Sequence, residues 1–163
     1  MRRAPAYRIT AGDGRSTEEL VAAGDYGYAH SCVTSDNFPV RPMSPHVREI
    51  VLLQFDHEVT SDEAIGEAAR RDLARPVYED ALYFGAAYPD VQRERPVVFL
   101  HEPWLGFFGR RDVVCLWTNA GRRELGLVGF DEPRARDDRL AFVRTDEYRV
   151  NPGSRPAPAR CTS

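Results

Sequence analysis

Two histidine–glutamate pairs in the sequence could bind a divalent metal. The pattern Phe-x-His-Glu occurs at residues 55–58 and again at residues 99–102, each time where an apolar run ends. If the intervening helical segment joins neighbouring parallel strands, both pairs emerge at the same edge of a sheet. Imidazole and carboxylate groups there could hold a metal that activates water for hydrolysis. The candidate ligands are His57, Glu58, His101 and Glu102.

The same pairs have a simpler interpretation. Strand ends meet water and collect polar residues, so these side chains could do no more than bind nearby backbone groups. The sequence has neither a His-Glu-x-x-His motif nor a cysteine partner that would favour a metal. A divalent metal is therefore the alternative, and the main expectation is a protein without a cofactor.

A second candidate is Cys32, which follows His30 by two positions. A thiolate becomes reactive beside a cation or an imidazole, and a turn or a strand at this point would allow that contact. No catalytic signature flanks the cysteine, which favours a structural or surface role. The sequence also has no Gly-x-Ser-x-Gly motif, which argues against a hydrolase with a nucleophile elbow.

The third candidate is the aromatic segment 104–111, which reads WLGFFGRR. Exposed on a glycine-hinged loop, its rings and arginines are the residue types that dominate protein-binding hot spots. They could also stack on bases of a single-stranded nucleic acid, or the rings could fold inward and close one end of the core. Tyrosines near residue 27 could extend an exposed surface. The candidate binding residues are Trp104, Phe107, Phe108, Arg110, Arg111, Tyr26 and Tyr28.

All 22 basic residues are arginine, and the absence of lysine excludes several mechanisms. A chain without lysine cannot form a Schiff base or a phosphate loop that ends in Gly-Lys. Arginine instead suits ion pairs and bidentate contacts. The formal net charge of -3 gives no general attraction to nucleic acid, so a protein partner or self-association is the expected interaction.

Composition indicates one globular domain. The chain has 163 residues, of which 42% are hydrophobic and 29% charged. No apolar run is long enough to cross a membrane, and no signal peptide follows the first residues, so we expect a soluble, cytoplasmic protein without a membrane partner. The three cysteines form neither a disulfide framework nor a metal-binding pair. Cys115 lies in an apolar run and is expected in the core.

The sequence divides into three parts. Residues 1–45 form an N-terminal helix and arm, because Ser16 and Glu19 make a capping box and Gly24 ends the apolar pattern. Residues 46–150 carry the α+β core domain. Residues 151–163 are rich in proline and lack large apolar side chains, which predicts a disordered tail.

Hydrophobic periodicity predicts the order of elements in the core domain. An apolar strand comes first, then two helices, of which the first begins with a capping box at residues 60–63, and then a run of antiparallel strands. A tight turn at residues 119–121 joins two of these strands. The predicted strands are 49–55, 97–100, 112–117, 124–130 and 139–143, and the predicted helices are 60–73 and 77–87.

Part of this segment resembles a family of uncharacterised bacterial proteins. The shared features are a helix pair, a bend of the form Y-P-x-x-Q-R-x-x-P at residues 88–96, and a closing strand that ends in V-R at residues 143–144. In the order of its elements the chain is also similar to C-type lectin-like domains, whose terminal strand pairs with the first. The characteristic disulfides and calcium-binding motifs are missing, so this resemblance implies a protein-binding version.

Together these observations predict a small α+β protein, with a possible C-type lectin-like order of elements. Its expected role is a non-catalytic recognition or assembly module that binds a protein through the aromatic and arginine loop. The alternative is a metal-dependent hydrolase that uses the paired histidines and glutamates.

Overall fold

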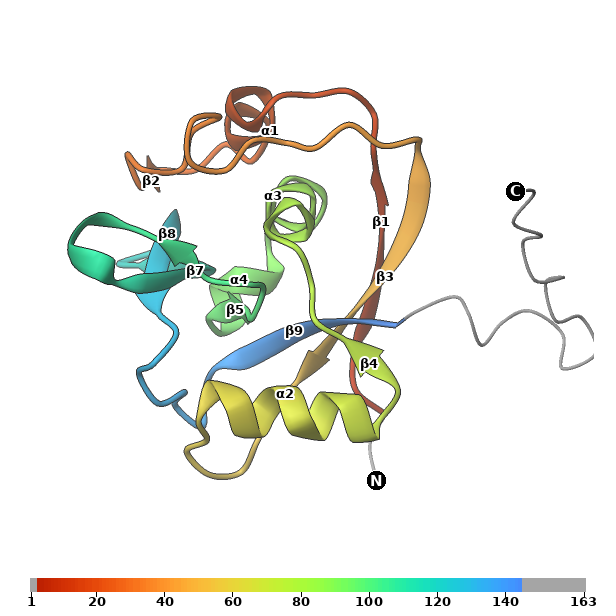
Figure 1. Cartoon of the computed structure of the whole chain (residues 1–163), viewed down its shortest axis with the longest axis vertical. Coiled ribbons are helices and arrows are strands. Elements are labelled where there is room, and N and C mark those ends of the chain that lie inside the picture. The colour runs from red at the N-terminus through yellow and green to blue at the C-terminus, as the bar shows by residue number, and fades with distance from the viewer. Residues whose placement is uncertain (1–2, 145–163) are drawn as a thin grey trace, which may run out of the picture.

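The structure, a computed structural model, describes residues 3–144 (Figure 1). One sheet of nine strands organises this part of the chain. Its strands are β1 (Ala6–Ala11), β2 (Tyr28–Ala29), β3 (His46–Leu53), β4 (Leu73–Ala74), β5 (Val97–Phe99), β6 (Trp104–Leu105), β7 (Arg111–Asn119), β8 (Arg122–Gly129) and β9 (Arg139–Arg144). Seven strands lie in the order β1-β3-β9-β5-β7-β8-β2, while β4 pairs with β9 and β6 with β7. The predicted α+β class is confirmed.

The helices begin where the sequence provides capping groups. They are α1 (Thr17–Ala23), α2 (Ser61–Arg70), α3 (Tyr78–Ala87) and the single turn α4 (Val91–Glu94). The hydroxyls of Ser16 and Thr60 each accept a hydrogen bond from a backbone N–H in the first turn, at 3.1 Å, as the two capping boxes predicted. Among the described residues, none of these helices has the length and apolar character needed to cross a lipid bilayer.

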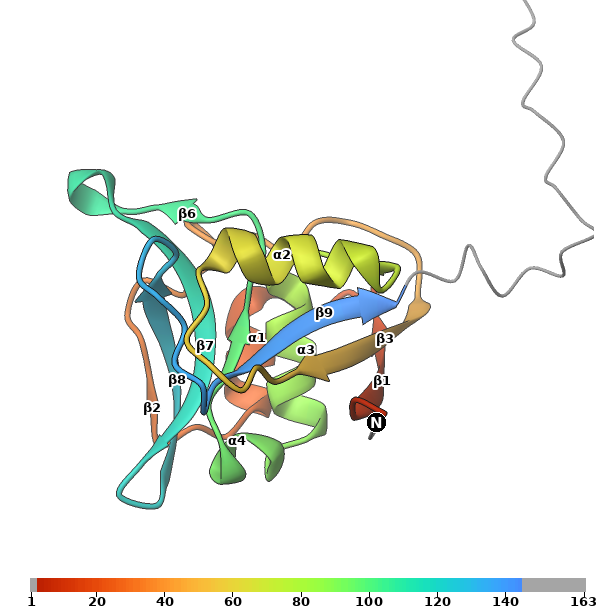
Figure 2. The same ribbon diagram turned by 90° about the horizontal axis from the view of Figure 1, so that it is seen from below.

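Two hydrophobic cores lie on opposite faces of the sheet. Successive residues of a strand point to opposite sides, so Ile50 and Leu52 contact α1 and α3, whereas Val51 and Leu53 contact α2. Figures 1 and 2 show α2 on one side of β3 and β9 and α3 on the other. Burial on both faces explains why the central strands read as nearly continuous apolar runs.

The hairpin of β7 and β8 is the longest paired region of the sheet. Its eight residue pairs run from Asp112 opposite Gly129 to Asn119 opposite Arg122. The two turn residues, Ala120 and Gly121, both have positive φ, at 50° and 80°. This is the left-handed geometry that suits a two-residue hairpin turn, and it confirms the predicted tight connection.

Two expectations about the strands need correction. The segment before residue 45 contains two strands that were not predicted: β1 pairs with β3 along all six of its residues, and the short β2 pairs with β8. The late strands are not all antiparallel, since β9 lies between β3 and β5, antiparallel to the first and parallel to the second. The predicted tail at residues 151–163, including Cys161, lies outside the described residues.

Candidate recognition loop and groove

The topology separates the two histidine–glutamate pairs. The β3 strand runs antiparallel to β9 and β5 runs parallel to β9, so β3 and β5 run in opposite directions. His57 follows the end of β3 and His101 follows the end of β5, and these ends face opposite edges of the sheet. The metal hypothesis required His57 and His101 to follow neighbouring parallel strands. Since β9 lies between β3 and β5 and these two strands run in opposite directions, that expectation is wrong.

His101 has a structural role. Its side chain is buried with 1% exposure, Nε2 accepts a hydrogen bond from the backbone N–H of Val114 at 3.0 Å, and Nδ1 lies 2.7 Å from the backbone oxygen of Glu102. Burial lowers the pKa of His101 to about 4. Both ring nitrogens are thus engaged by the backbone, and the ring is neutral near pH 7.

The other three candidate ligands are exposed, and the pair at residues 57–58 lies apart from the pair at residues 101–102. His57 Nδ1 is 2.6 Å from a carboxylate oxygen of Asp56, and Glu102 forms an ion pair with Arg75 at 2.7 Å. Glu58 lies in the same exposed loop as His57. Across residues 3–144, no group of three or more histidine, cysteine, aspartate or glutamate side chains is arranged to hold a metal.

His30 and Cys32 occupy a hydrogen-bonded turn. The Nδ1 atom of His30 accepts a hydrogen bond from the backbone N–H of Cys32 at 3.1 Å, and Asn37 donates to the Cys32 carbonyl at 2.9 Å. The Nδ1 atom of His30 therefore stabilises the backbone of this turn. Cys115 is buried, and burial raises the pKa of its thiol to about 12, as expected for a core residue.

The aromatic segment forms a projecting loop, which we call the 104–111 loop. Leu105, Phe107 and Phe108 are exposed, at 67%, 78% and 107%. Phe108 also has a left-handed backbone, with φ of 63° and ψ of 19°. A bulky residue rarely adopts this conformation, which costs on the order of 1 kcal/mol. The sequence also allowed the rings of Trp104, Phe107 and Phe108 to fold into the core. For Phe107 and Phe108 this alternative is wrong.

Trp104 anchors this loop to the body of the protein. Its ring packs against Phe38 at a centroid distance of 5.3 Å, within the core that contains α1 and α3. The strand β6 pairs with the start of β7, and the N–H of Gly106 donates to the carbonyl of Arg110 at 2.9 Å. The loop is therefore closed at its base, with its two phenylalanines at the tip.

The two arginines of the loop are paired within the chain. Arg110 Nε donates to Asp112 at 2.6 Å, and Arg111 donates to Asp131 at 3.0 Å. The guanidinium of Arg111 also stacks over the ring of Phe130, 4.7 Å from its centroid. These ion pairs balance the positive charge at the base of the loop, so the exposed tip is apolar in character.

The two candidate tyrosines lie elsewhere. The Tyr26 hydroxyl points into the protein, where burial raises its pKa to about 12 and Arg123 stacks over the ring at 4.7 Å. The sequence suggested that Tyr26 could extend the surface of the loop, but its buried hydroxyl and its contact with Arg123 show that it does not. Tyr28 is 47% exposed on β2, opposite Glu124 and thus near the other end of the β7–β8 hairpin.

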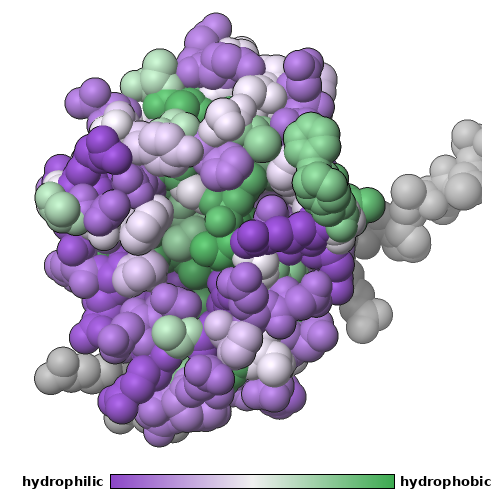
Figure 3. Space-filling view, turned by 90° about the vertical axis from the view of Figure 1, so that its left-hand side faces the viewer, coloured by the Kyte–Doolittle hydropathy of each residue, from purple (hydrophilic) through white to green (hydrophobic). Residues whose placement is uncertain are grey.

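Tyr28 instead forms one wall of a second feature, which we call the β7–β8 groove. This groove has a volume of about 340 Å³ and lies on the outer face of β7, β8 and β2. Its apolar and aromatic lining includes Val98, Cys115, Trp117, Gly126 and Val128, and its polar lining includes His30, Glu124, Arg134 and Asp138. Figure 3 looks onto this side of the molecule and shows hydrophobic side chains in a hollow among polar ones. The sequence predicted the two strands from their apolar segments, but such segments do not show which face of a strand is covered by other elements.

The loop and the groove together hold most of the exposed large hydrophobic side chains in the described part of the chain. Residues 3–144 have seven exposed large hydrophobic side chains, and five of them are Leu105, Phe107 and Phe108 on the loop and Tyr28 and Trp117 at the groove. Large apolar side chains that gather on one side of a molecule typically mark a site of interaction.

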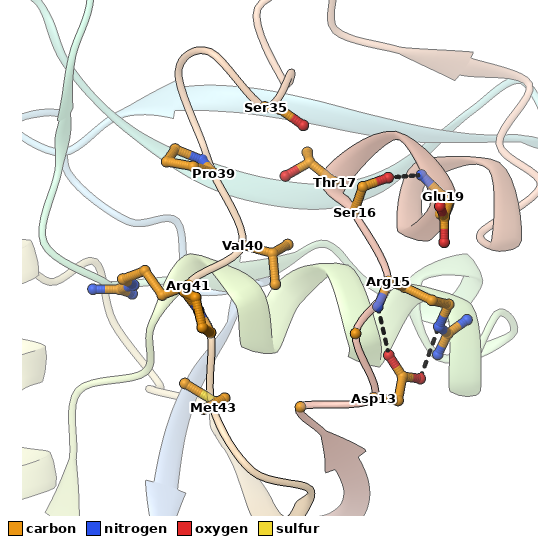
Figure 4. A pocket seen from close by; sticks show the side chains of 13 residues that line it. Asp13, Arg15, Ser16, Thr17, Glu19, Ser35, Pro39, Val40, Arg41 and Met43 are labelled. Atoms are coloured by element: carbon orange, nitrogen blue, oxygen red, sulfur yellow. Dashed lines mark hydrogen bonds and ion pairs between the residues drawn. The ribbon is translucent and has the colours of Figure 1, made fainter.

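A larger pocket, of about 630 Å³, lies between residues 12–19 and residues 35–43 (Figure 4). Its polar side chains already bind one another or nearby groups. Arg15 pairs with Asp13 at 2.8 Å, and Arg41 forms a bidentate ion pair with Glu79. The short helix α1, which begins at this pocket, has its first turn capped by Ser16. These groups stabilise the packing of two loops and leave little charge for a ligand.

Comparisons with known proteins identify no relative. No family model matches the sequence, no curated protein matches it, and no solved structure matches the fold. The site must therefore be interpreted from its own geometry and chemistry.

Proposed function

We propose that this protein is a non-catalytic recognition or assembly module that binds a protein partner through the 104–111 loop. The observation that carries the proposal is the pair of exposed rings of Phe107 and Phe108 on a closed loop, with Phe108 in a left-handed backbone. Large rings that are already positioned bury much area at a small cost in entropy when a partner binds.

The charges of the loop favour a protein over a nucleic acid. A nucleic-acid site needs arginines that are free to contact phosphate, but Arg110 and Arg111 both pair with aspartates of this chain. Apolar rings bordered by balanced charges instead suit a partner with an apolar pocket and a polar rim. A metal-dependent hydrolase has less support, since the candidate ligands lie apart and His101 is held by backbone groups.

The proposed C-type lectin-like arrangement is compatible with this role. The last described strand, β9, pairs antiparallel with β3, the strand that precedes the two helices, while β1 pairs with the other side of β3. A lectin-like domain of this kind would bind protein, because the characteristic calcium-binding motifs are absent from the sequence.

Site-specific photo-cross-linking tests the proposed function. A photoreactive phenylalanine at position 108 of the full chain should form a recurrent protein adduct in cells, identified by mass spectrometry. The same group at Val47, which is 51% exposed on β3, is the matched control. We expect the position 108 adduct to disappear when Phe107 is replaced by serine. Equal labelling from both positions would contradict recognition through the loop.

A further inference from the structure

We propose that the partner of the 104–111 loop is a second copy of this chain, and that the loop of each copy occupies the β7–β8 groove of the other in a two-fold dimer. This inference rests on the proposed function, and it names the partner. Its basis is that one molecule presents both an apolar projection and an apolar hollow.

The placement of the two features suits a two-fold axis. The loop precedes β7 directly, whereas the groove extends along the outer face of β7 to Trp117 and across β8 to β2. Figure 3 shows a hydrophobic projection at one edge of this side and the hydrophobic hollow nearer its middle. When two such faces meet about a two-fold axis that passes midway between the projection and the hollow, each projection lies opposite the hollow of the other copy and the contact closes.

Two symmetric contacts bury an area typical of a weak, reversible dimer. Two exposed phenylalanine rings can bury roughly 300–400 Å², since an aromatic side chain buries ~150–250 Å². The groove is small, with a volume of about 340 Å³, and its own surface adds on the order of 100 Å². One contact then buries roughly 450 Å² and two symmetric contacts roughly 900 Å², at the low end of interface sizes, where weak and transient contacts lie.

The groove has the chemistry to accept a phenyl ring. The indole of Trp117 lies over Gly126, where a β-carbon would come within 3.3 Å of the indole nitrogen, so the ring presents an aromatic surface to the groove. Trp117 and Tyr28 both lie opposite Glu124 in the strand pairing, so their side chains stand on the same face and form aromatic walls. Rings packed between such walls gain from edge-to-face contacts in addition to apolar burial.

The chain's own residues 145–163 are the other occupant to consider. They follow β9 at Arg144, and β5 and β7 lie between β9 and β8. That end of β9 pairs with Glu49 of β3, away from the groove. The segment also carries few large apolar side chains, namely Tyr148 and Val150, so the paired rings of the loop of a second copy match the apolar groove better.

The first test is the oligomeric state of the full chain by sedimentation over a concentration series. A reducing agent must be present, because Cys32 is a free cysteine. We expect a reversible dimer that the double variant Phe107→Ser/Phe108→Ser weakens by at least about 30-fold, the effect of losing a hot spot. The control Val47→Ser also removes an exposed apolar side chain, and we expect it to dimerise like the unmodified chain.

A groove variant tests the other half of the contact. Trp117→Arg places a charge in the groove at an exposed position of the hairpin, opposite Glu124, whose carboxylate already pairs with Arg122 at 3.0 Å. The control Asn119→Arg adds the same charge to the hairpin outside the groove. We expect only Trp117→Arg to weaken the dimer, with circular dichroism and melting temperature unchanged. Undiminished dimerisation of folded Trp117→Arg would overturn the proposal.

Mixing the two defective variants tests reciprocity. The loop variant and the groove variant each lack both contacts as homodimers, but a mixed pair retains one intact loop and one intact groove. We expect the mixture to form a heterodimer that neither variant forms alone. If the loops of two copies packed against each other instead, mixing would restore nothing.

The remaining outcomes separate this inference from the proposed function. A monomeric chain whose position 108 cross-links to another protein would overturn self-association and leave loop-mediated recognition standing. A monomeric chain without any loop-dependent adduct would overturn both. If removal of residues 145–163 changed Trp117 fluorescence in a monomeric chain, the groove would hold the chain's own C-terminal segment and self-association would be wrong.

Discussion

The imidazole of His101 accepts a hydrogen bond from the backbone N–H of Val114, at 3.0 Å from Nε2 to N. This bond joins the segment after β5 to the middle of β7 in the buried part of the sheet. The contact requires an unprotonated Nε2, so the stability of the protein depends on the neutral form of one histidine. His101, which the sequence suggested as a metal ligand, instead connects two parts of the sheet through this hydrogen bond.

The first prediction concerns acid pH. Burial lowers the pKa of His101 from 6.5 to about 4, so its contribution to stability is present above pH 6.5 and is lost as pH falls toward 4. We expect this histidine to account for a loss of up to ~3 kcal/mol in the free energy of unfolding. Urea denaturation across this range should show a shallower pH dependence for His101→Gln. The exposed His57→Gln is the control, and an unchanged slope in His101→Gln would contradict the assignment.

The second prediction concerns alkaline pH. Burial raises the pKa of Cys115 from 9.0 and that of Tyr26 from 10.0, each to about 12. Both groups are neutral in the folded state, so their contributions to the free energy of unfolding are complete below pH 9 and are lost as pH rises toward 12. Because the chain has no lysine, no ammonium group titrates in this window. Thermal unfolding should show a smaller alkaline loss in Cys115→Ala and Tyr26→Phe, and full retention of the loss in both would refute the prediction.

The third prediction separates folding from binding within the 104–111 loop. Trp104 packs in the core, so Trp104→Ala should lower the free energy of unfolding by roughly 2 kcal/mol, somewhat less than for a fully buried aromatic ring. Phe107→Ser/Phe108→Ser removes only exposed rings, and chemical denaturation of dilute protein should show a change within about 0.5 kcal/mol. A large loss of stability in the double variant would mean that these rings support the fold.

The fourth prediction concerns backbone strain at Phe108. A glycine accepts its φ of 63° without a steric cost, so Phe108→Gly should raise the free energy of unfolding of the monomer by about 1 kcal/mol. Phe108→Ala keeps the β-carbon and should leave it nearly unchanged. The same Phe108→Gly variant should dimerise less well, since it lacks one ring of the contact. Equal stability of the glycine and alanine variants, measured by urea denaturation, would show that the strain is absent.

Much of the local structure could be predicted from the sequence. Ser16 and Thr60 carry hydroxyls that cap the next turn, so the starts of α1 and α2 follow from a few neighbouring residues. The strands β3 and β7 follow from apolar runs that suit burial on both faces. The strand β1 escaped prediction because only Ile9 and Ala11 of its six residues are buried, which leaves a short and weak alternation.

The candidate site depended on information that the sequence does not contain. The sequence identified the rings of Phe107 and Phe108 but allowed them to point inward or outward. It also allowed His57 and His101 to converge, since strand direction was unknown. The groove was missed because the apolar segments of β7 and β8 predict buried strands without showing how far α2 covers their outer face.

By itself the sequence determined the helix starts, the hairpin turn and the class of fold, because these depend on hydrogen bonds and side-chain periodicity among neighbouring residues. Only the tertiary structure decided that β9 lies between β3 and β5, that Phe107 and Phe108 project, and that a groove remains open beside Trp117. These features depend on pairing and packing between segments far apart in the chain, where small differences in the total free energy select one arrangement among several.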